Sequence, residues 1–113
     1  MPFRSSNSPL PLTPLAFEVL LALVDRDLHG YAILQAVEAR LAGLLPLRTG
    51  TLYRSLARLL EQKLIEEIDG PAGDDERRRN YRLTSHGREI AVMEAERLAE
   101  QVAAARARKL LTR

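Results

Sequence analysis

The sequence predicts a mainly α-helical fold with a small β-hairpin and a long final helix. Four segments carry apolar residues at the spacing that is typical of helices. Two short segments rich in β-branched and aromatic residues flank a charged stretch that contains glycine and proline, which favours a hairpin. The chain has 113 residues, which is enough for one domain but not for two.

The first predicted helix has a well-marked beginning. Thr13 is a hydroxyl N-cap, and Pro14 suits the first helical position because its fixed backbone angle and missing N–H do no harm there. The helix should run to about Asp25. It has almost no polar face, which predicts that it is buried between other elements.

The second predicted helix lies between two glycines. It follows Gly30, spans about residues 31–42 and is expected to end at Gly43, which can serve as its C-cap. Residues 44–48 include a proline, so they can form a brief edge strand at most.

The third predicted helix spans about residues 49–63 and has two different faces. One stripe is apolar and should face the core, and it consists of Leu52, Leu56, Leu59 and Leu60. The opposite stripe is polar and consists of Thr51, Arg54, Ser55 and Arg58.

The second half of the chain predicts a hairpin and a long helix. Residues 64–69 and 80–84 are the expected strands, and residues 70–79 form a long charged tip. Thr84 is the expected N-cap of a final helix that runs to about Leu111. The order of helices and strands is that of a winged helix-turn-helix followed by a long C-terminal helix.

The composition excludes several classes of protein. The net charge of +2 and the estimated pI of 9.4 permit nucleic-acid binding, but only the placement of the charges can argue for it. The chain has no cysteine, which excludes disulfides and thiolate sites. It has no apolar run of about 20 residues and no apolar leader in its first residues. We therefore expect a cytoplasmic protein with no cofactor and no metal.

The polar stripe of the third helix has the chemistry of a DNA-reading surface. It carries hydroxyls and guanidiniums and no acid, and Thr49 adds a further hydroxyl at the helix start. Hydroxyls and backbone amides at a helix N-terminus suit phosphate. Arg54 and Arg58, one turn apart, can reach guanine edges in a major groove. The alternative is an ordinary solvated face, since arginine is also a good helix former.

The hairpin tip carries a second basic group. Arg77, Arg78 and Arg79 are consecutive and can lie on phosphates or along a minor groove. The acids at positions 74–76 could instead neutralise them locally, but exposed ion pairs are worth only about 0–1 kcal/mol, so phosphates can displace them. Three adjacent acids lack the alternating spacing of a calcium loop.

The tyrosines and one histidine are further candidates. Tyr31 and Tyr53 can offer hydroxyls to phosphates, although a buried ring is equally consistent for Tyr53 and is favoured for Tyr81. His29 can contact phosphate or have only a structural role. The residues expected to bind DNA are His29, Tyr31, Thr49, Thr51, Tyr53, Arg54, Ser55, Arg58, Arg77, Arg78 and Arg79.

An ordered set of short motifs closely resembles the PadR family of transcriptional regulators. The resemblance covers about residues 12–111 and is specific as a set, although each piece is weak. The motifs are Leu12-Thr13-Pro14-Leu15, Leu28-His29-Gly30-Tyr31, Gly50-Thr51-Leu52-Tyr53, Asp74-Asp75-Glu76-Arg77-Arg78-Arg79, and Tyr81-Arg82-Leu83-Thr84 with Gly87.

The resemblance implies a winged-helix dimer that usually represses transcription, often of its own gene. It also implies DNA contacts from the wing arginines and from the positions that match Tyr31, Thr51, Tyr53 and Arg54. Lys63 departs from the pattern, because such proteins usually carry glycine there. The single C-terminal helix matches the shorter members, which lack a separate ligand-sensing domain. A small-molecule effector is a further candidate partner.

Two other classes of function compete with this interpretation. An enzyme would need a nucleophile with a base or a metal cluster, and the only two histidines, His29 and His86, lie in different predicted elements with no carboxylate at ligand spacing. A winged-helix module that binds protein instead of DNA remains the alternative, because fold does not determine function. The polar stripe without acids on the third helix argues against that alternative.

The final helix carries an apolar seam that predicts a homodimer. Its residues follow the alternating four- and three-residue spacing of a coiled coil, and they are Ala91, Ala95, Leu98, Val102 and Ala105. A frayed amphipathic tail is the alternative. The chain therefore divides into a flexible N-terminal arm at 1–12, a winged helix-turn-helix DNA-binding domain at 13–84 and a C-terminal dimerisation helix at 85–113.

Overall fold

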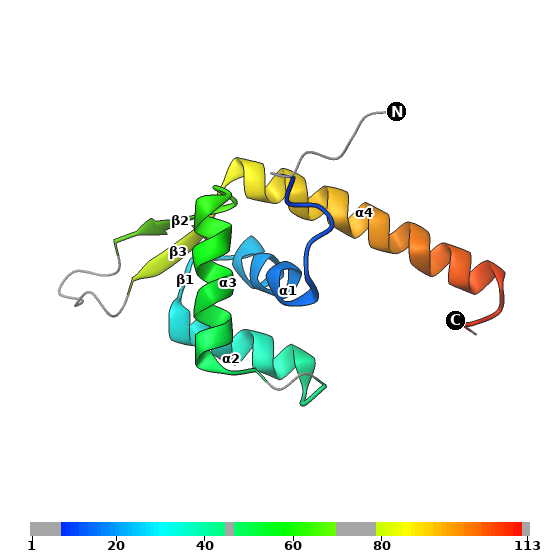
Figure 1. Cartoon of the computed structure of the whole chain (residues 1–113), viewed down its shortest axis with the longest axis horizontal. Helices are drawn as coiled ribbons and strands as arrows, with labels where there is room; N and C mark the ends of the chain where they lie inside the picture. Colours follow the sequence, from blue (N-terminus) through cyan, green and yellow to red (C-terminus); the bar gives the residue numbers. More distant parts are fainter. Residues whose placement is uncertain (1–7, 45–46, 70–78, 112–113) are drawn as a thin grey trace.

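A computed structural model of the chain describes residues 8–44, 47–69 and 79–111. It confirms the predicted fold, which is mainly helical with a small antiparallel sheet (Figure 1). In chain order the elements are α1 (Pro14–Val24), β1 (Leu28–His29), α2 (Gly30–Leu41), α3 (Thr49–Glu61), β2 (Ile65–Ile68), β3 (Asn80–Leu83) and α4 (Ser85–Ala107).

Two helices begin where the sequence predicts. The hydroxyl of Thr13 accepts a hydrogen bond from the Ala16 amide at 3.1 Å, which caps α1, and Pro14 follows at the first helical position. The hydroxyl of Thr84 accepts from the Gly87 amide at 2.9 Å and caps α4 in the same way. Both caps satisfy backbone donors that the helix itself leaves without partners.

The third strand of the sheet differs from the prediction. The expected edge strand at 44–48 is absent from residues 44, 47 and 48, which are the described part of that segment. The strand is instead β1, which lies before α2 and pairs antiparallel with β3 through Leu28↔Tyr81 and His29↔Asn80. The sheet order is β1-β3-β2. A two-residue strand has no periodicity of its own, so its pairing with β3 alone defines it.

Two helices end earlier than predicted, and both end in the same way. α3 stops at Glu61 and α4 at Ala107, because Lys63 and Lys109 adopt left-handed backbone angles with φ of 62°. In each case the amide after the lysine donates back to a carbonyl in the last helical turn, which is the Schellman arrangement. Glycine is favoured at this position because it has no Cβ, which explains why the family resemblance expects glycine at position 63.

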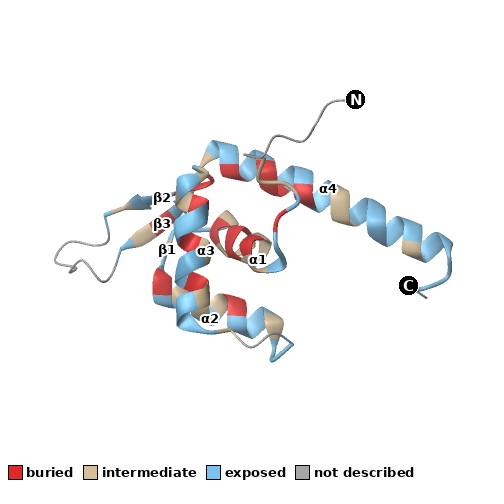
Figure 2. Ribbon diagram, viewed as in Figure 1, coloured by how far each residue is buried: buried red, intermediate tan, exposed pale blue. Residues whose placement is uncertain are grey.

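The core lies around α1, which contacts the other three helices and β3 (Figure 2). This confirms that α1 is buried between other elements. The predicted apolar stripe of α3 faces this core, because Leu52, Leu56 and Leu59 are each at most 1% exposed. The remaining buried apolar residues are Leu12, Ala16, Val19, Leu20, Leu23, Ile33, Val37, Leu64, Ile65, Tyr81, Ile90 and Ala91.

Only the first half of α4 packs on this core. Ile90 and Ala91 are buried, and the guanidinium of Arg88 donates to the Val24 carbonyl at the C-terminal end of α1 at 3.2 Å. Beyond Leu98 the helix projects away from the winged domain (Figure 1), and Val102 is 42% exposed. None of the helices in the described ranges is both long and apolar enough to cross a membrane.

Candidate nucleic-acid interface

The polar face of α3 is turned away from the core. Arg54 and Arg58 are exposed, whereas Thr51 and Ser55 are half-buried between them and the apolar stripe. Nη2 of Arg54 donates to the hydroxyl of Thr51 at 3.3 Å, which tethers one guanidinium to the first turns of the helix. The exposed face therefore presents two guanidiniums along its length and hydroxyls at their base.

The N-terminus of α3 has no side-chain cap. Its N-cap residue is Arg48, and no hydrogen bond joins the Arg48 side chain to the first turn. Thr49 and Gly50 are exposed. The first amides of a helix are hydrogen-bond donors at the positive end of the helix dipole, so this end of α3 suits a phosphate group.

Tyr53 connects the start of α3 to the start of α2. A Cβ added at Gly30 would lie 2.5 Å from the Tyr53 hydroxyl oxygen and 3.0 Å from Cζ, so the ring end rests directly against this glycine. Tyr53 is 43% exposed and Tyr31, the next residue after Gly30, is 61% exposed. The Tyr53 hydroxyl is thus placed at the start of α2, where phosphate contacts are expected, and Tyr31 is the second residue of the same helix.

Tyr81 lies in the core, as predicted. It is 8% exposed, and burial together with the nearby carboxylate of Glu67 raises the pKa of its hydroxyl. Tyr81 therefore holds β3 against the helices and is not part of the exposed polar surface.

His29 has a structural role, which is one of the two interpretations that the sequence left open. It is the N-cap of α2, and its Nδ1 accepts a hydrogen bond from the Ala32 amide at 3.2 Å. The side chain is exposed. The position directly before Gly30, at the start of a helix, was the available signal, but histidine is not among the usual N-cap residues.

The wing is described only at its base. Arg77 and Arg78, together with the acids at 74–76, lie outside the described residues. Arg79 is exposed, and its Nη1 forms an ion pair with Glu67 Oε2 at 2.8 Å across the two strands. Pairing of the wing arginines with the acids at 74–76 stays a prediction, because those acids lie outside the described residues. An exposed pair of this kind is worth about 0–1 kcal/mol, so a phosphate can replace the carboxylate.

The predicted dimer seam divides into two groups, which are Ala91 in the chain's own core and the four later residues, which are half-buried or exposed. Ala91 is 8% exposed and belongs to the core of its own chain. Leu98 and Ala105 are half-buried, whereas Ala95 and Val102 are exposed. The part of the seam that a partner could cover in a dimer therefore begins after Ala91.

A buried acid lies between these two groups on α4. Glu94 is 2% exposed and accepts two hydrogen bonds from Arg97, at 2.7 and 2.8 Å. These bonds hold the pKa of Glu94 below its ordinary value. This pair is not among the predicted site residues, and its signal in the sequence is the three-residue spacing of opposite charges on a helix.

A cavity of about 530 Å³ lies between the N-terminal segment, α1 and α4. The Glu94–Arg97 pair lines it, and so does a second ion pair in which Arg40 Nε lies 2.6 Å from Glu18 Oε1. Its apolar lining comes from Pro11, Leu12, Pro14, Phe17, Leu21 and Leu98. An apolar hollow flanked by ion pairs can accept an apolar helix face from another molecule.

Two curated relatives resemble the chain in sequence. An uncharacterized protein X from Lysinibacillus sphaericus is 31% identical over 70 residues, which cover 62% of this chain and 64% of that protein. An uncharacterized 37.1 kDa protein in transposon TN4556 of Streptomyces fradiae is 42% identical over 81 residues, covering 72% of this chain and 22% of that protein. The chain thus spans less than two thirds of the length of both relatives.

Solved structures share the fold of the chain. A PadR family transcription regulator from Clostridium difficile matches with a TM-score of 0.71 at 21% identity, covering 83% of this chain and 96% of that one. A transcriptional regulator from Clostridium thermocellum matches with a TM-score of 0.66 at 23% identity, covering 87% and 92%. The pattern of the "Transcriptional regulator PadR-like family" matches residues 19–92. The chain therefore belongs to the PadR-like family of transcriptional regulators.

Proposed function

We propose that this protein is a homodimeric repressor that binds an inverted-repeat operator on double-stranded DNA in the cytoplasm. The observation that carries the proposal is the polar face of α3, on which Arg54 and Arg58 are exposed and no acid interrupts the stripe. In winged helix-turn-helix proteins the corresponding helix lies in the major groove. Arg54 and Arg58 then face base edges, and the uncapped start of α3 faces phosphate.

The remaining candidates extend this surface along the DNA backbone. Thr49, Thr51, Tyr53 and Ser55 lie on or beside the same face of α3, and Tyr31 and His29 lie at the start of α2. We assign these hydroxyls and the imidazole to phosphate contacts, which position a protein on the duplex without reading its sequence. The wing arginines 77–79 add phosphate or minor-groove contacts.

The dimer is supported by the apolar distal half of α4 and by the cavity beside α1. Val102 is 42% exposed, so the distal half of α4 presents an apolar stripe to solvent. Leu98 lines the cavity between α1 and α4, which is a second apolar surface on the same protomer. We propose that a second copy of α4 covers both, because an uncovered stripe would leave an apolar patch in water. A two-fold axis then presents two α3 helices to half-sites about one DNA turn, or a multiple of it, apart.

A gel-shift assay on the promoter upstream of the protein's own gene tests the proposal. Retardation of this DNA at a concentration that leaves random DNA of equal length unbound is the expected result. Equal affinity for both DNAs, or no binding to either, would favour a winged-helix module that binds protein.

Substitution of Arg54 should separate base reading from phosphate binding. Arg54→Ala should cost about 1–3 kcal/mol on operator DNA and less on random DNA, because a bidentate base contact is sequence-specific. Arg78→Ala should weaken binding to both DNAs and lower the salt slope by about one unit, because one phosphate contact releases roughly one counterion. Salt titrations of each variant on both DNAs provide the measurement.

Arg108→Ala is the control of matched charge, since Arg108 lies at the far end of α4. It should change neither affinity. Equal losses on operator and random DNA for Arg54→Ala would remove Arg54 from the base-reading role.

A further inference from the structure

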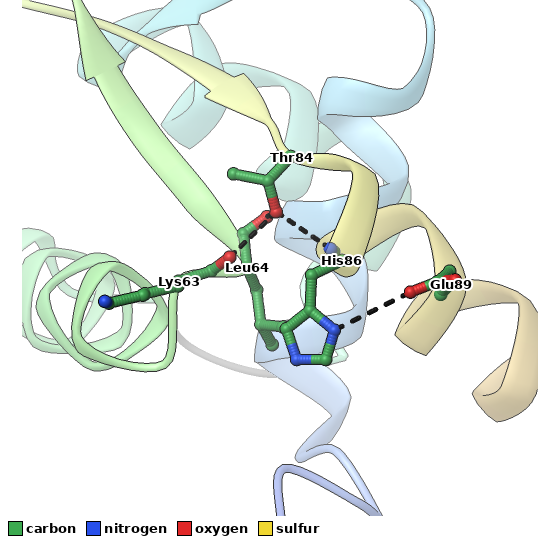
Figure 3. A network of polar contacts seen from close by, with 6 residues as sticks. Lys63, Leu64, Thr84, His86 and Glu89 are labelled. Carbon is green, nitrogen blue, oxygen red and sulfur yellow. Dashed lines mark hydrogen bonds and ion pairs between the residues drawn. The ribbon is translucent and has the colours of Figure 1, made fainter.

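A compact polar junction joins the end of α3 to the start of α4 (Figure 3). The hydroxyl of Thr84 donates its single proton to two carbonyl oxygens that share it, that of Lys63 at 2.8 Å and that of Leu64 at 3.1 Å. The same hydroxyl accepts from the Gly87 amide at 2.9 Å, and the Thr84 amide donates to the Leu64 carbonyl at 3.1 Å. One residue thus binds both the backbone that ends α3 and the first turn of α4.

The two sides of this junction are themselves fixed. Leu64 is fully buried, and its amide donates to the Leu59 carbonyl in the last turn of α3 at 3.0 Å. Gly87 is buried on the other side, and a Cβ at this position would collide with the Leu64 carbonyl oxygen. Because backbone meets backbone without an intervening side chain, a tilt of α4 relative to α3 has to change this contact and the Thr84 hydrogen bonds.

We propose that Thr84 is a positioning residue that sets the angle between α3 and α4 and thereby the spacing of the two DNA half-sites that the dimer accepts. The inference rests on the proposed function, because it needs a dimer that forms through α4 and reads DNA with α3. No DNA contact is assigned to Thr84 itself. Thr84 affects DNA binding indirectly, because it sets the orientation of α3 relative to α4, the helix through which the dimer forms.

The geometry makes small changes at this junction consequential. α3 has 13 residues and is therefore about 20 Å long. A tilt of about 10° at its C-terminal end moves its N-terminal end by about 3.5 Å, which is close to the rise of one base pair. Each protomer contributes one such tilt, so a loose junction should allow the dimer to accept half-sites at several spacings.

The chemistry of the hydroxyl provides a selective test. A hydroxyl can donate one hydrogen bond and accept another at the same oxygen. Thr84→Ser retains both functions and is the conservative control. Thr84→Asp keeps the oxygen that caps α4, because aspartate is a good N-cap, but it cannot donate to the carbonyls of Lys63 and Leu64 when ionised. Thr84→Asp therefore preserves the helix cap and removes the side-chain hydrogen bonds to α3, while the backbone amide of residue 84 still donates to the Leu64 carbonyl.

The experiment uses the full chain and a series of synthetic operators. The wild type first selects its inverted repeat from random DNA, and the spacer of that repeat is then shortened or lengthened by single base pairs. The wild type and Thr84→Ser should prefer one spacer by about tenfold or more, which is the usual cost of a lost base contact. Thr84→Asp should bind an isolated half-site like the wild type but accept neighbouring spacers within about threefold of one another.

A distance measurement on the dimer gives an independent result if Thr84→Asp proves too unstable for binding assays. The chain has no cysteine, so Ala57→Cys on the exposed face of α3 allows one spin label per protomer. The distribution of label-to-label distances should be narrow in the wild type and in Thr84→Ser, and broader in Thr84→Val, which has the shape of threonine without its hydroxyl.

Unchanged spacer preference in Thr84→Asp, or unchanged distance distributions in Thr84→Val, would overturn the positioning role while leaving the proposed function intact. A wild type that selects no inverted repeat would overturn the proposed function, and this inference with it.

Discussion

Gly87→Ala should destabilise the protein by about 1–3 kcal/mol or more, which is a typical cost of forcing an extra methyl group into a packed site. Gly87 lies in the first turn of α4, and its added Cβ would collide with the Leu64 carbonyl oxygen and lie 2.9 Å from Cδ1 of Leu83. The carbonyl belongs to the backbone that ends α3, so it cannot move aside as a flexible side chain could. Urea denaturation at fixed protein concentration measures the change in the free energy of unfolding.

Gly50→Ala is a matched control for this substitution. Gly50 also lies in the first turn of a helix, but a Cβ there would meet only Nη1 of Arg54 at 3.6 Å, an ordinary contact distance. This variant should be as stable as the wild type or more stable by up to about 1 kcal/mol, because alanine favours helix over glycine. A Gly87→Ala protein as stable as Gly50→Ala would contradict the close packing of α4 on the end of α3.

Val102→Glu should convert the dimer to a monomer and abolish tight operator binding. It places a carboxylate in the apolar stripe that we propose a second copy covers, where a charge without a partner is costly to bury. A monomer engages one half-site at a time, so operator affinity should fall by about 10²-fold or more through the loss of the second, linked contact. Analytical ultracentrifugation and gel shifts measure the two effects, and circular dichroism checks that the winged domain remains folded.

Ala104→Glu controls for the added charge. Position 104 is two residues further along α4 and therefore on nearly the opposite side of the helix, where it is exposed. This variant should remain dimeric and bind the operator like the wild type. A wild-type protein that is monomeric at micromolar concentration and still binds its operator tightly would contradict the proposed dimer.

Local signals account for the parts of the fold that the sequence predicted well. The caps at Thr13 and Thr84 depend on residues within three positions of each other, and the core stripe of α3 follows directly from helical spacing. The ends of α3 and α4 were placed too late, because Lys63 and Lys109 occupy left-handed conformations that glycine usually marks. β1 could not be predicted, since only its pairing with β3 defines it.

In the candidate site, too, features that depend on neighbouring residues were predicted, and contacts between residues far apart in the chain were not. The exposure of Arg54 and Arg58 follows from their place opposite the leucine stripe of α3. The ion pair of Arg79 with Glu67 was missed because Glu67 is twelve positions away in the chain but adjacent across the hairpin. Ala91 was assigned to the dimer seam because a heptad pattern cannot distinguish a face that packs on its own domain from one that packs on a partner.

Selection of bound sequences from random DNA, followed by sedimentation of the selected complex, tests the central claim most directly. The proposal predicts that the wild type enriches one inverted repeat whose half-sites lie about one helical turn, or a multiple of it, apart, and that the complex contains two protein chains per duplex. Enrichment of no sequence above the random pool, with binding that depends only on salt, would contradict it.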